Sequence, residues 1–271
     1  MSPIREAFAA LKCRGRGGFI PFITAGDPDI ATTELLLIEL AAAGADIIEL
    51  GVPFSDPVAD GKTIQRASER ALRKGVTLRD VLTCVARAKQ HIAVPIVLFS
   101  YFNPLLRFGE DRLANKAKEA GVDAVLVTDL IPEEAQTWIE ILVQRDLDPI
   151  FLVAPTTSDQ RLKQIAGQAR GFIYAVSRAG VTGARDEMTG DAEALVKRVR
   201  SVSDLPVAVG FGISTAEQVR EVWRFADAAV IGSAIVSQIE RLGNSPDLVQ
   251  RVGELARSLV APMQMDRAVV S

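Results

Sequence analysis

Two acidic residues close together in this sequence have the types and spacing for proton-transfer chemistry. Glu49 lies near the end of the apolar run 46–50, and Asp60 lies in the loop that follows that run. If the run is a strand, Ile47 and Glu49 share one face. A Glu carboxyl that faces the interior is desolvated, which raises its pKa and suits a general acid–base near neutral pH.

Each carboxylate also has a structural interpretation. A buried Glu can pair with Arg or Lys, but the apolar runs that we interpret as strands contain neither. Asp60 precedes Gly61, and Asp before Gly is typical of a turn. Pro53 and Pro57 stiffen the loop, which brings Asp56 to the same rim. A buried carboxyl in the strand and a carboxyl in the loop that follows it can hold different protonation states at one site, as acid–base pairs do.

Three glycine-rich segments are candidates for a lid and a phosphate site. Segment 177–185 is long enough to close over a substrate and exclude water, although a disordered connection has the same composition. Segments 210–214 and 231–234 contain glycines, which let backbone N–H groups approach an anion. A helix that begins after Gly232 would add a favourable dipole.

Aromatic residues late in the predicted strands are candidates for the walls of a pocket. They are Phe22, Phe99, Tyr101, Tyr174 and Phe211. A flat apolar substrate group would suit them, and packing in the core explains any one of them as well.

Composition excludes several classes of protein. Lys plus Arg total 31 against 34 Asp plus Glu, a net charge of -3, so a nucleic-acid-binding face is not expected. Cys13 and Cys84 cannot build a disulfide framework or a four-thiolate zinc site, and the single His91 removes most metal sites. Residues 1–12 contain no signal-like stretch, and no apolar run is long enough to span a bilayer. We therefore expect a cytoplasmic protein that binds neither membrane nor nucleic acid.

Eight short apolar runs alternate with amphipathic helical stretches, which predicts an α/β fold. The runs are 19–24, 46–50, 95–101, 123–128, 149–153, 171–177, 206–211 and 228–232, and helices are expected at 32–43, 133–145, 158–169 and 215–223. A doubly wound sheet would also alternate in this way. The count of eight, with added segments at 1–14 and 77–90, favours a single (β/α)8 TIM barrel with extra N-terminal and inserted helices. The expected domain is 1–271, with a tail at about 262–271 that is a candidate for disorder. Active sites of such barrels lie at the C-terminal ends of the strands.

Four segments closely resemble the α subunit of tryptophan synthase: residues 21–28, 49–61, 177–183 and 210–214. The resemblance covers about residues 3–262, and the second segment, ELGVPFSDPVADG, is highly specific. It implies cleavage of indole-3-glycerol phosphate to indole and glyceraldehyde 3-phosphate in tryptophan biosynthesis. It also implies a β subunit that carries pyridoxal phosphate and receives the indole in an α2β2 heterotetramer, with no cofactor or metal in this chain.

The resemblance also implies roles for individual residues. Glu49 matches the acid–base that protonates C3 of indole and assists proton removal from the glyceryl hydroxyl. Asp60 matches the carboxylate that bonds the indole N–H. The remaining matches are Gly183, Gly212, Gly232 and Ser233 in the phosphate cradle; Phe22, Phe99, Tyr101, Tyr174 and Phe211 around the indole and glyceryl group; Thr182 in the lid, where it meets Asp60; and Pro53, Asp56 and Arg178 in loops that face the β subunit.

Some positions depart from the family pattern, and some alternatives stay open. Lys62 stands where the family usually has Pro, and Phe99 is bulkier than the common residue. A Schiff-base aldolase would need a Lys at a strand end, a zinc aldolase several His, and a related isomerase a strand-end Cys, none of which the pattern supplies. A free-standing lyase that releases indole, or a non-catalytic phosphate-binding partner that regulates a β subunit, would share the fold.

Overall fold

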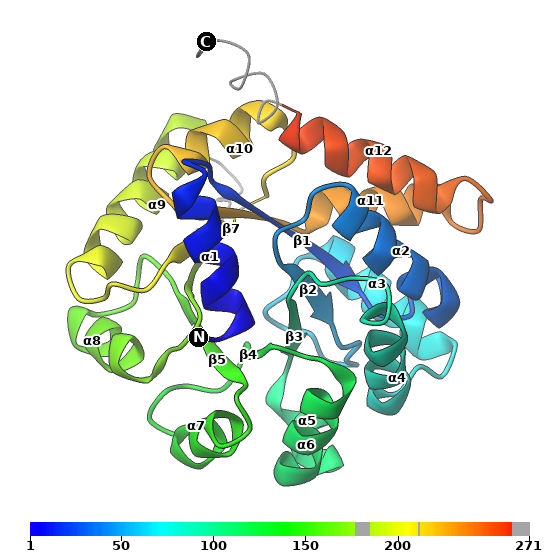
Figure 1. Ribbon diagram of the computed structural model, residues 1–271, viewed down its shortest axis with the longest axis horizontal. Helices are drawn as coiled ribbons and strands as arrows, with labels where there is room; N and C mark the ends of the chain where they lie inside the picture. The colour runs from blue at the N-terminus through cyan, green and yellow to red at the C-terminus, as the bar shows by residue number, and fades with distance from the viewer. Residues whose placement is uncertain (177–184, 211, 262–271) are drawn as a thin grey trace.

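Eight parallel strands pair in chain order and close into a barrel, because β1 pairs with both β2 and β8 (Figure 1). The computed structural model describes residues 1–176, 185–210 and 212–261, with the backbone alone for residues 185–189. The strands are β1 (Gly18–Thr24), β2 (Ile48–Gly51), β3 (Ile96–Ser100), β4 (Ala124–Val127), β5 (Asp148–Val153), β6 (Ile173–Val176), β7 (Val207–Gly210) and β8 (Ala228–Ile231). Each predicted run overlaps one of them, so the predicted (β/α)8 barrel is confirmed.

Helices separate the strands and form the outer ring seen in Figure 1. They are α1 (Pro3–Cys13), α2 (Ile30–Ala42), α3 (Lys62–Arg73), α4 (Leu78–Ala88), α5 (Phe102–Phe108), α6 (Glu110–Ala120), α7 (Gln136–Val143), α8 (Asp159–Gln168), α9 (Arg185–Arg200), α10 (Ala216–Trp223), α11 (Ser233–Leu242) and α12 (Leu248–Val260). Helices α1 and α4 confirm the predicted N-terminal and inserted helices. Within the described ranges, no helix is both long and apolar enough to cross a membrane.

Two predicted helix boundaries have different outcomes. Thr215 caps α10, because its side chain accepts from the Gln218 amide and the Gln218 side chain accepts in return, as the sequence indicates. The predicted start of α7 at residue 133 is wrong, because α7 begins at Gln136. The amide of Glu134 instead donates to the Ile131 carbonyl, so a tight turn precedes the helix.

The two faces of each strand point to different parts of the core. Ile47 of the segment before β2 packs among residues of the barrel interior, whereas Ile48 and Leu50 pack in the cluster between barrel and helices. The predicted alternation is therefore confirmed, and it turns Glu49 inward. Ile4, Phe8 and Leu11 of α1 join the same interior cluster, so α1 closes the N-terminal end of the barrel.

Acidic residues that precede three of the strands hold that N-terminal end together. Asp46, Asp123 and Asp227 accept the backbone N–H groups of Phe19, Ile96 and Val207, each at the start of a neighbouring strand. The distances are 2.8 to 2.9 Å. These carboxylates are occupied by the fold, which leaves the opposite rim for chemistry.

Candidate active site

The C-terminal ends of the strands surround a cavity of about 660 Å³. The described residues that line it come from the strand ends, from the loop that ends at Gly61, and from the starts of α3 and α11: Phe22, Glu49, Ala59, Asp60, Gly61, Lys62, Thr63, Ile64, Phe99, Thr128, Leu152, Val153, Ala154, Thr157, Tyr174, Val176, Gly210, Gly212, Val230, Gly232 and Ser233. Glu49 and Asp60 therefore line the same cavity, at the C-terminal end of the barrel where active sites of this fold lie.

Glu49 is the most unusual ionisable group of the cavity. Its side chain is 0% exposed, and neither carboxylate oxygen has a hydrogen-bond partner among the described residues. Burial raises the pKa of Glu49 from 4.5 to about 8, because water no longer stabilises the charged form. A carboxyl with this pKa is protonated at neutral pH and can donate its proton.

Asp60 is both a turn residue and a cavity residue. Its amide donates to the Pro57 carbonyl, and its own carbonyl accepts from the Gln65 side chain, so the backbone is fixed in a turn. Burial raises the pKa of the Asp60 carboxyl to about 6, and the nearby Tyr101 hydroxyl opposes that rise. At neutral pH Asp60 is therefore mostly ionised while Glu49 is mostly protonated, which is the division of states that acid–base pairs use.

Tyr101 lies behind the loop rather than among the residues that line the cavity. Its hydroxyl accepts the Ala59 amide at 2.9 Å, and its ring packs 5.1 Å from the ring of Phe54. Tyr101 thus ties the loop that carries Asp60 to the end of β3.

Phe22, Phe99 and Tyr174 form part of the apolar floor around Glu49. The rings of Phe22 and Phe99 meet edge to face, with centroids 5.3 Å apart. Burial raises the pKa of the Tyr174 hydroxyl, and the charges of Glu49 and Asp60 add to that rise. All three side chains reach the cavity and keep its floor poor in water.

Two glycines at strand ends make room for these rings, and sequence analysis did not identify them as such. A Cβ on Gly51 would lie 2.6 Å from the Phe22 ring, and a Cβ on Gly210 would lie 2.4 Å from the Tyr174 hydroxyl. Sequence analysis also missed Ile64, Thr128, Leu152 and Thr157 of the lining. Leu152 pairs with Tyr174 across β5 and β6, so the alternation of β5 carried a signal for it.

The described part of the glycine-rich segments lies where an anion could bind. Helix α11 begins at Ser233, as predicted, and Gly232 precedes it without a side-chain cap. Gly232 has a φ of -109°, and an added Cβ would meet Phe22 at an ordinary 3.4 Å, so the fold itself would accept a side chain here. Gly212 has a φ of 58° and open space around a Cβ. Open space at Gly212, and a position at the start of α11 for Gly232, suit a bound anion.

The remaining candidate residues lie elsewhere or outside the described residues. Pro53 is buried and Asp56 is exposed in the loop after β2. Arg178, Thr182, Gly183 and Phe211 lie outside the described residues.

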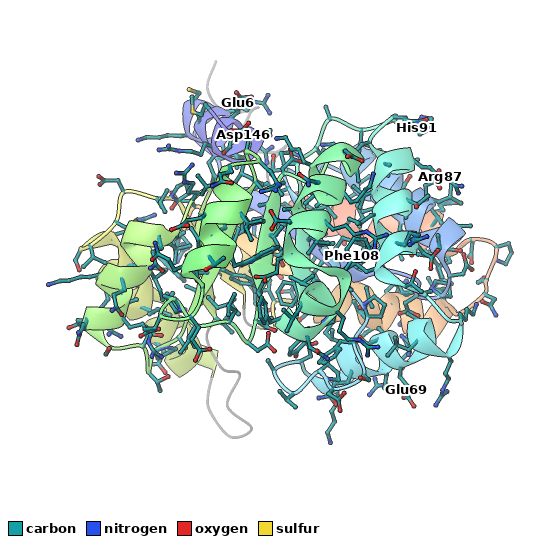
Figure 2. All side chains as sticks on the ribbon, turned by 90° about the horizontal axis from the view of Figure 1, so that it is seen from below. Glu6, Glu69, Arg87, His91, Phe108 and Asp146 are labelled. Atoms are coloured by element: carbon teal, nitrogen blue, oxygen red, sulfur yellow. The ribbon has the colours of Figure 1, made fainter. Side chains whose placement is uncertain are left out.

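The single histidine and the two cysteines, which two of the alternative enzymes would need, lie away from the cavity, whereas Lys62 lines it. Figure 2 shows His91 at the same end of the barrel as Glu6 and Asp146, opposite Glu69 of α3. Cys13 ends α1, and Cys84 is buried in α4, where burial raises the pKa of its thiol to about 12. The eight described strands contain no lysine. Apart from Lys62 at the start of α3, the acidic and basic side chains among the described lining residues are the carboxyl groups of Glu49 and Asp60.

The comparisons with known proteins agree with one another. The family described as "Tryptophan synthase alpha chain" matches residues 8–264. The tryptophan synthase alpha chain of Citrifermentans bemidjiense is 50% identical over 259 residues, 96% of this chain and 97% of that protein. That of Synechocystis sp. is 47% identical over 260 residues, 96% of this chain and 98% of that protein.

Solved structures give the same result. Tryptophan synthase subunit alpha from Legionella pneumophila has a TM-score of 0.90 at 36% identity, covering 98% of this chain and 99% of that chain. A chain of the tryptophan synthase complex from Pyrococcus furiosus has a TM-score of 0.83 at 38% identity, covering 91% of this chain and 98% of that chain. This chain therefore belongs to the tryptophan synthase alpha chain family.

Proposed function

We propose that this chain cleaves indole-3-glycerol phosphate to indole and glyceraldehyde 3-phosphate, with Glu49 as the acid–base. The observation that carries the proposal is a fully buried, unpaired Glu49 in a cavity that also holds Asp60. Breaking the carbon–carbon bond requires C3 of the ring to become tetrahedral, and a neutral carboxylic acid in an apolar site is suited to protonate it.

The steps balance with these two carboxyl groups. The Glu49 carboxyl gives its proton to C3, and the ring nitrogen takes up the positive charge, which the Asp60 carboxylate stabilises through the N–H. The Glu49 carboxylate then removes the proton of the neighbouring glyceryl hydroxyl. The oxygen forms the aldehyde C=O, the C3–carbon bond breaks, and its electron pair restores the aromatic ring. Glu49 ends protonated, ready for the next cycle.

The rest of the cavity would bind and orient the substrate. Phe22, Phe99 and Tyr174 would hold the flat ring, with Phe211 as a further wall. The phosphate would lie at the start of α11, where Gly232 and Ser233 present backbone N–H groups. Gly183 and Gly212 would complete its cradle, and Thr182 would meet Asp60 as the lid closes. Tyr101 would act through the loop that it supports.

The proposed partner is a β subunit that carries pyridoxal phosphate and receives the indole, in an α2β2 assembly. Its docking side would include Pro53, Asp56 and Arg178. Val58, which is 85% exposed, lines a groove of about 930 Å³ beside Asp56, and an exposed apolar side chain there suits an interface. A cytoplasmic location fits the free thiols of Cys13 and Cys84.

The test replaces Glu49 with Gln and measures indole release and substrate binding separately. We expect cleavage to be lost while indole-3-glycerol phosphate still binds. Appreciable turnover by Glu49→Gln would remove Glu49 from this role. Indole release with and without an added β subunit addresses the second candidates: high activity of the chain alone indicates a free-standing lyase, and no cleavage in either state indicates a non-catalytic partner.

A further inference from the structure

Lys62 is a cation at the mouth of the cavity that the proposed mechanism leaves unused. Its exposed side chain lines both the 660 Å³ cavity and the neighbouring groove beside Asp56. Among the described lining residues of the cavity, the acidic and basic side chains are those of Glu49, Asp60 and Lys62. A phosphate dianion entering this space would otherwise meet two acidic residues and no described cation.

Every other cation of α3 is paired. Arg66 and Arg70 both donate to Glu240, and Arg73 pairs with Glu69 in the same helix. Within the part of the chain that the structure describes, Lys62 forms no ion pair. Its ammonium group is therefore available for a charge from outside the chain.

The position of Lys62 in its helix also lacks a structural benefit. It is the first residue of α3, where the helix dipole is positive, and the first turn contains no acidic residue. Gly61 caps the helix without a side-chain hydrogen bond. Proline is favoured at the first position of a helix, so a lysine here is not the residue that helix geometry prefers. An anion bound nearby would offset both the dipole and the side-chain charge.

An ion-pair clamp joins the middle and later part of α3 to the last turn of α11. Glu240 of α11 accepts from Arg66 at 2.6 and 2.7 Å and from Arg70 at 2.7 Å. Lys62 begins α3 and Ser233 begins α11, and both residues line the cavity. Lys62 thus shares the cavity with the helix start where the substrate phosphate is proposed to bind.

We infer that Lys62 is a further phosphate-binding residue, which supplies the positive charge that the amides around Gly232 and Ser233 lack. This inference rests on the proposed substrate. Lys62 binds the remote phosphate and takes no part in the proton transfers, so it acts on substrate affinity rather than on the chemical step.

The test compares Lys62→Met, which removes the charge, with Lys62→Arg, which keeps it. Lys74→Met is the matched control, because Lys74 is exposed at the other end of α3 and is not among the residues that line the cavity. For the full chain with its β subunit, we expect Lys62→Met to raise the KM for indole-3-glycerol phosphate about fivefold, or about 1 kcal/mol at about 1.4 kcal/mol per tenfold. The kcat stays within about twofold, and high salt reduces the difference in KM.

Binding of two probes separates a phosphate contact from a change in loop structure. Inorganic phosphate, measured by competition, should lose the same factor in Lys62→Met, while indole should bind as before. Lys62→Arg and Lys74→Met should match the unmodified chain in both. The inference is overturned if phosphate affinity is unchanged, if phosphate and indole weaken equally, or if Lys62→Met weakens only the capture of the β subunit. If the unmodified chain does not cleave the substrate, the proposed function fails, and phosphate competition still tests Lys62.

Discussion

Replacing Glu49 with glutamine should remove cleavage and at the same time stabilise the folded chain. The unmodified carboxyl has a pKa of about 8 when folded, against an ordinary value of 4.5. Between these two pH values the unfolded chain releases a proton that the folded chain retains. A group with a raised folded pKa contributes its stability fully below the unfolded pKa and loses it as pH rises through the folded pKa. Glutamine has a similar shape and does not titrate.

The size of the effect follows from the interval between the two pKa values. One pKa unit corresponds to about 1.4 kcal/mol. At pH 7 the unmodified carboxyl therefore costs roughly 3 kcal/mol relative to acidic solution, because pH 7 lies about 2.5 units above the unfolded pKa. At pH 5 the cost is about 1 kcal/mol, and it levels off above pH 8. The gain in Glu49→Gln should follow this curve.

Urea unfolding of both proteins at several pH values between 5 and 9 measures the gain. Glu134→Gln is the matched control, because Glu134 is exposed and should show no trend with pH. We expect the difference in the free energy of unfolding between Glu49→Gln and the unmodified chain to rise by about 1.4 kcal/mol per pH unit up to about pH 8. A difference that is flat with pH, or that falls as pH rises, would refute the reasoning from burial.

Two further predictions concern pH and the ion-pair clamp. The kcat/KM for substrate cleavage should rise with pH through about 6, as Asp60 ionises, and fall through about 8, as Glu49 loses its proton. Asp60→Asn should lower kcat strongly and remove the rise of kcat/KM near pH 6. An unchanged kcat would assign Asp60 to the turn alone. Arg70→Met should lower the free energy of unfolding by about 3 kcal/mol or more, because Arg70 donates two hydrogen bonds of 2.8 Å to the buried Asp27. The control Arg73→Met removes an exposed ion pair and should lower the free energy of unfolding by less than about 1 kcal/mol. Equal losses for the two variants in urea unfolding would contradict this prediction.

The barrel and the inward direction of Glu49 could be predicted because both depend on local patterns. Segments 43–48 and 120–125 have similar sequences, with a glycine between the end of a helix and the start of a buried strand. Gly44 and Gly121 have the positive φ that these helix ends require. Alternation along a strand then decides which side chains face inward, without knowledge of the partner strands.

The parts that could not be predicted depend on contacts between distant segments. Tyr101 follows the same alternation as Phe99, yet a hydrogen bond to Ala59 places it behind the loop, 42 positions away in the chain. The pairing of Arg70 with Glu240 joins residues 170 positions apart, and no local pattern indicates it. The start of α7 was missed because the acidic residues after Pro132 suit a helix start as well as a turn.

Infrared difference spectroscopy of the unmodified chain against Glu49→Gln tests most directly whether the barrel interior keeps this carboxyl protonated at neutral pH. We predict a protonated-carboxyl band at pH 7 that disappears with a midpoint near pH 8, the pKa that burial gives Glu49. A carboxyl that ionises near pH 4.5 would leave the cavity without its proton donor and would contradict the proposed mechanism.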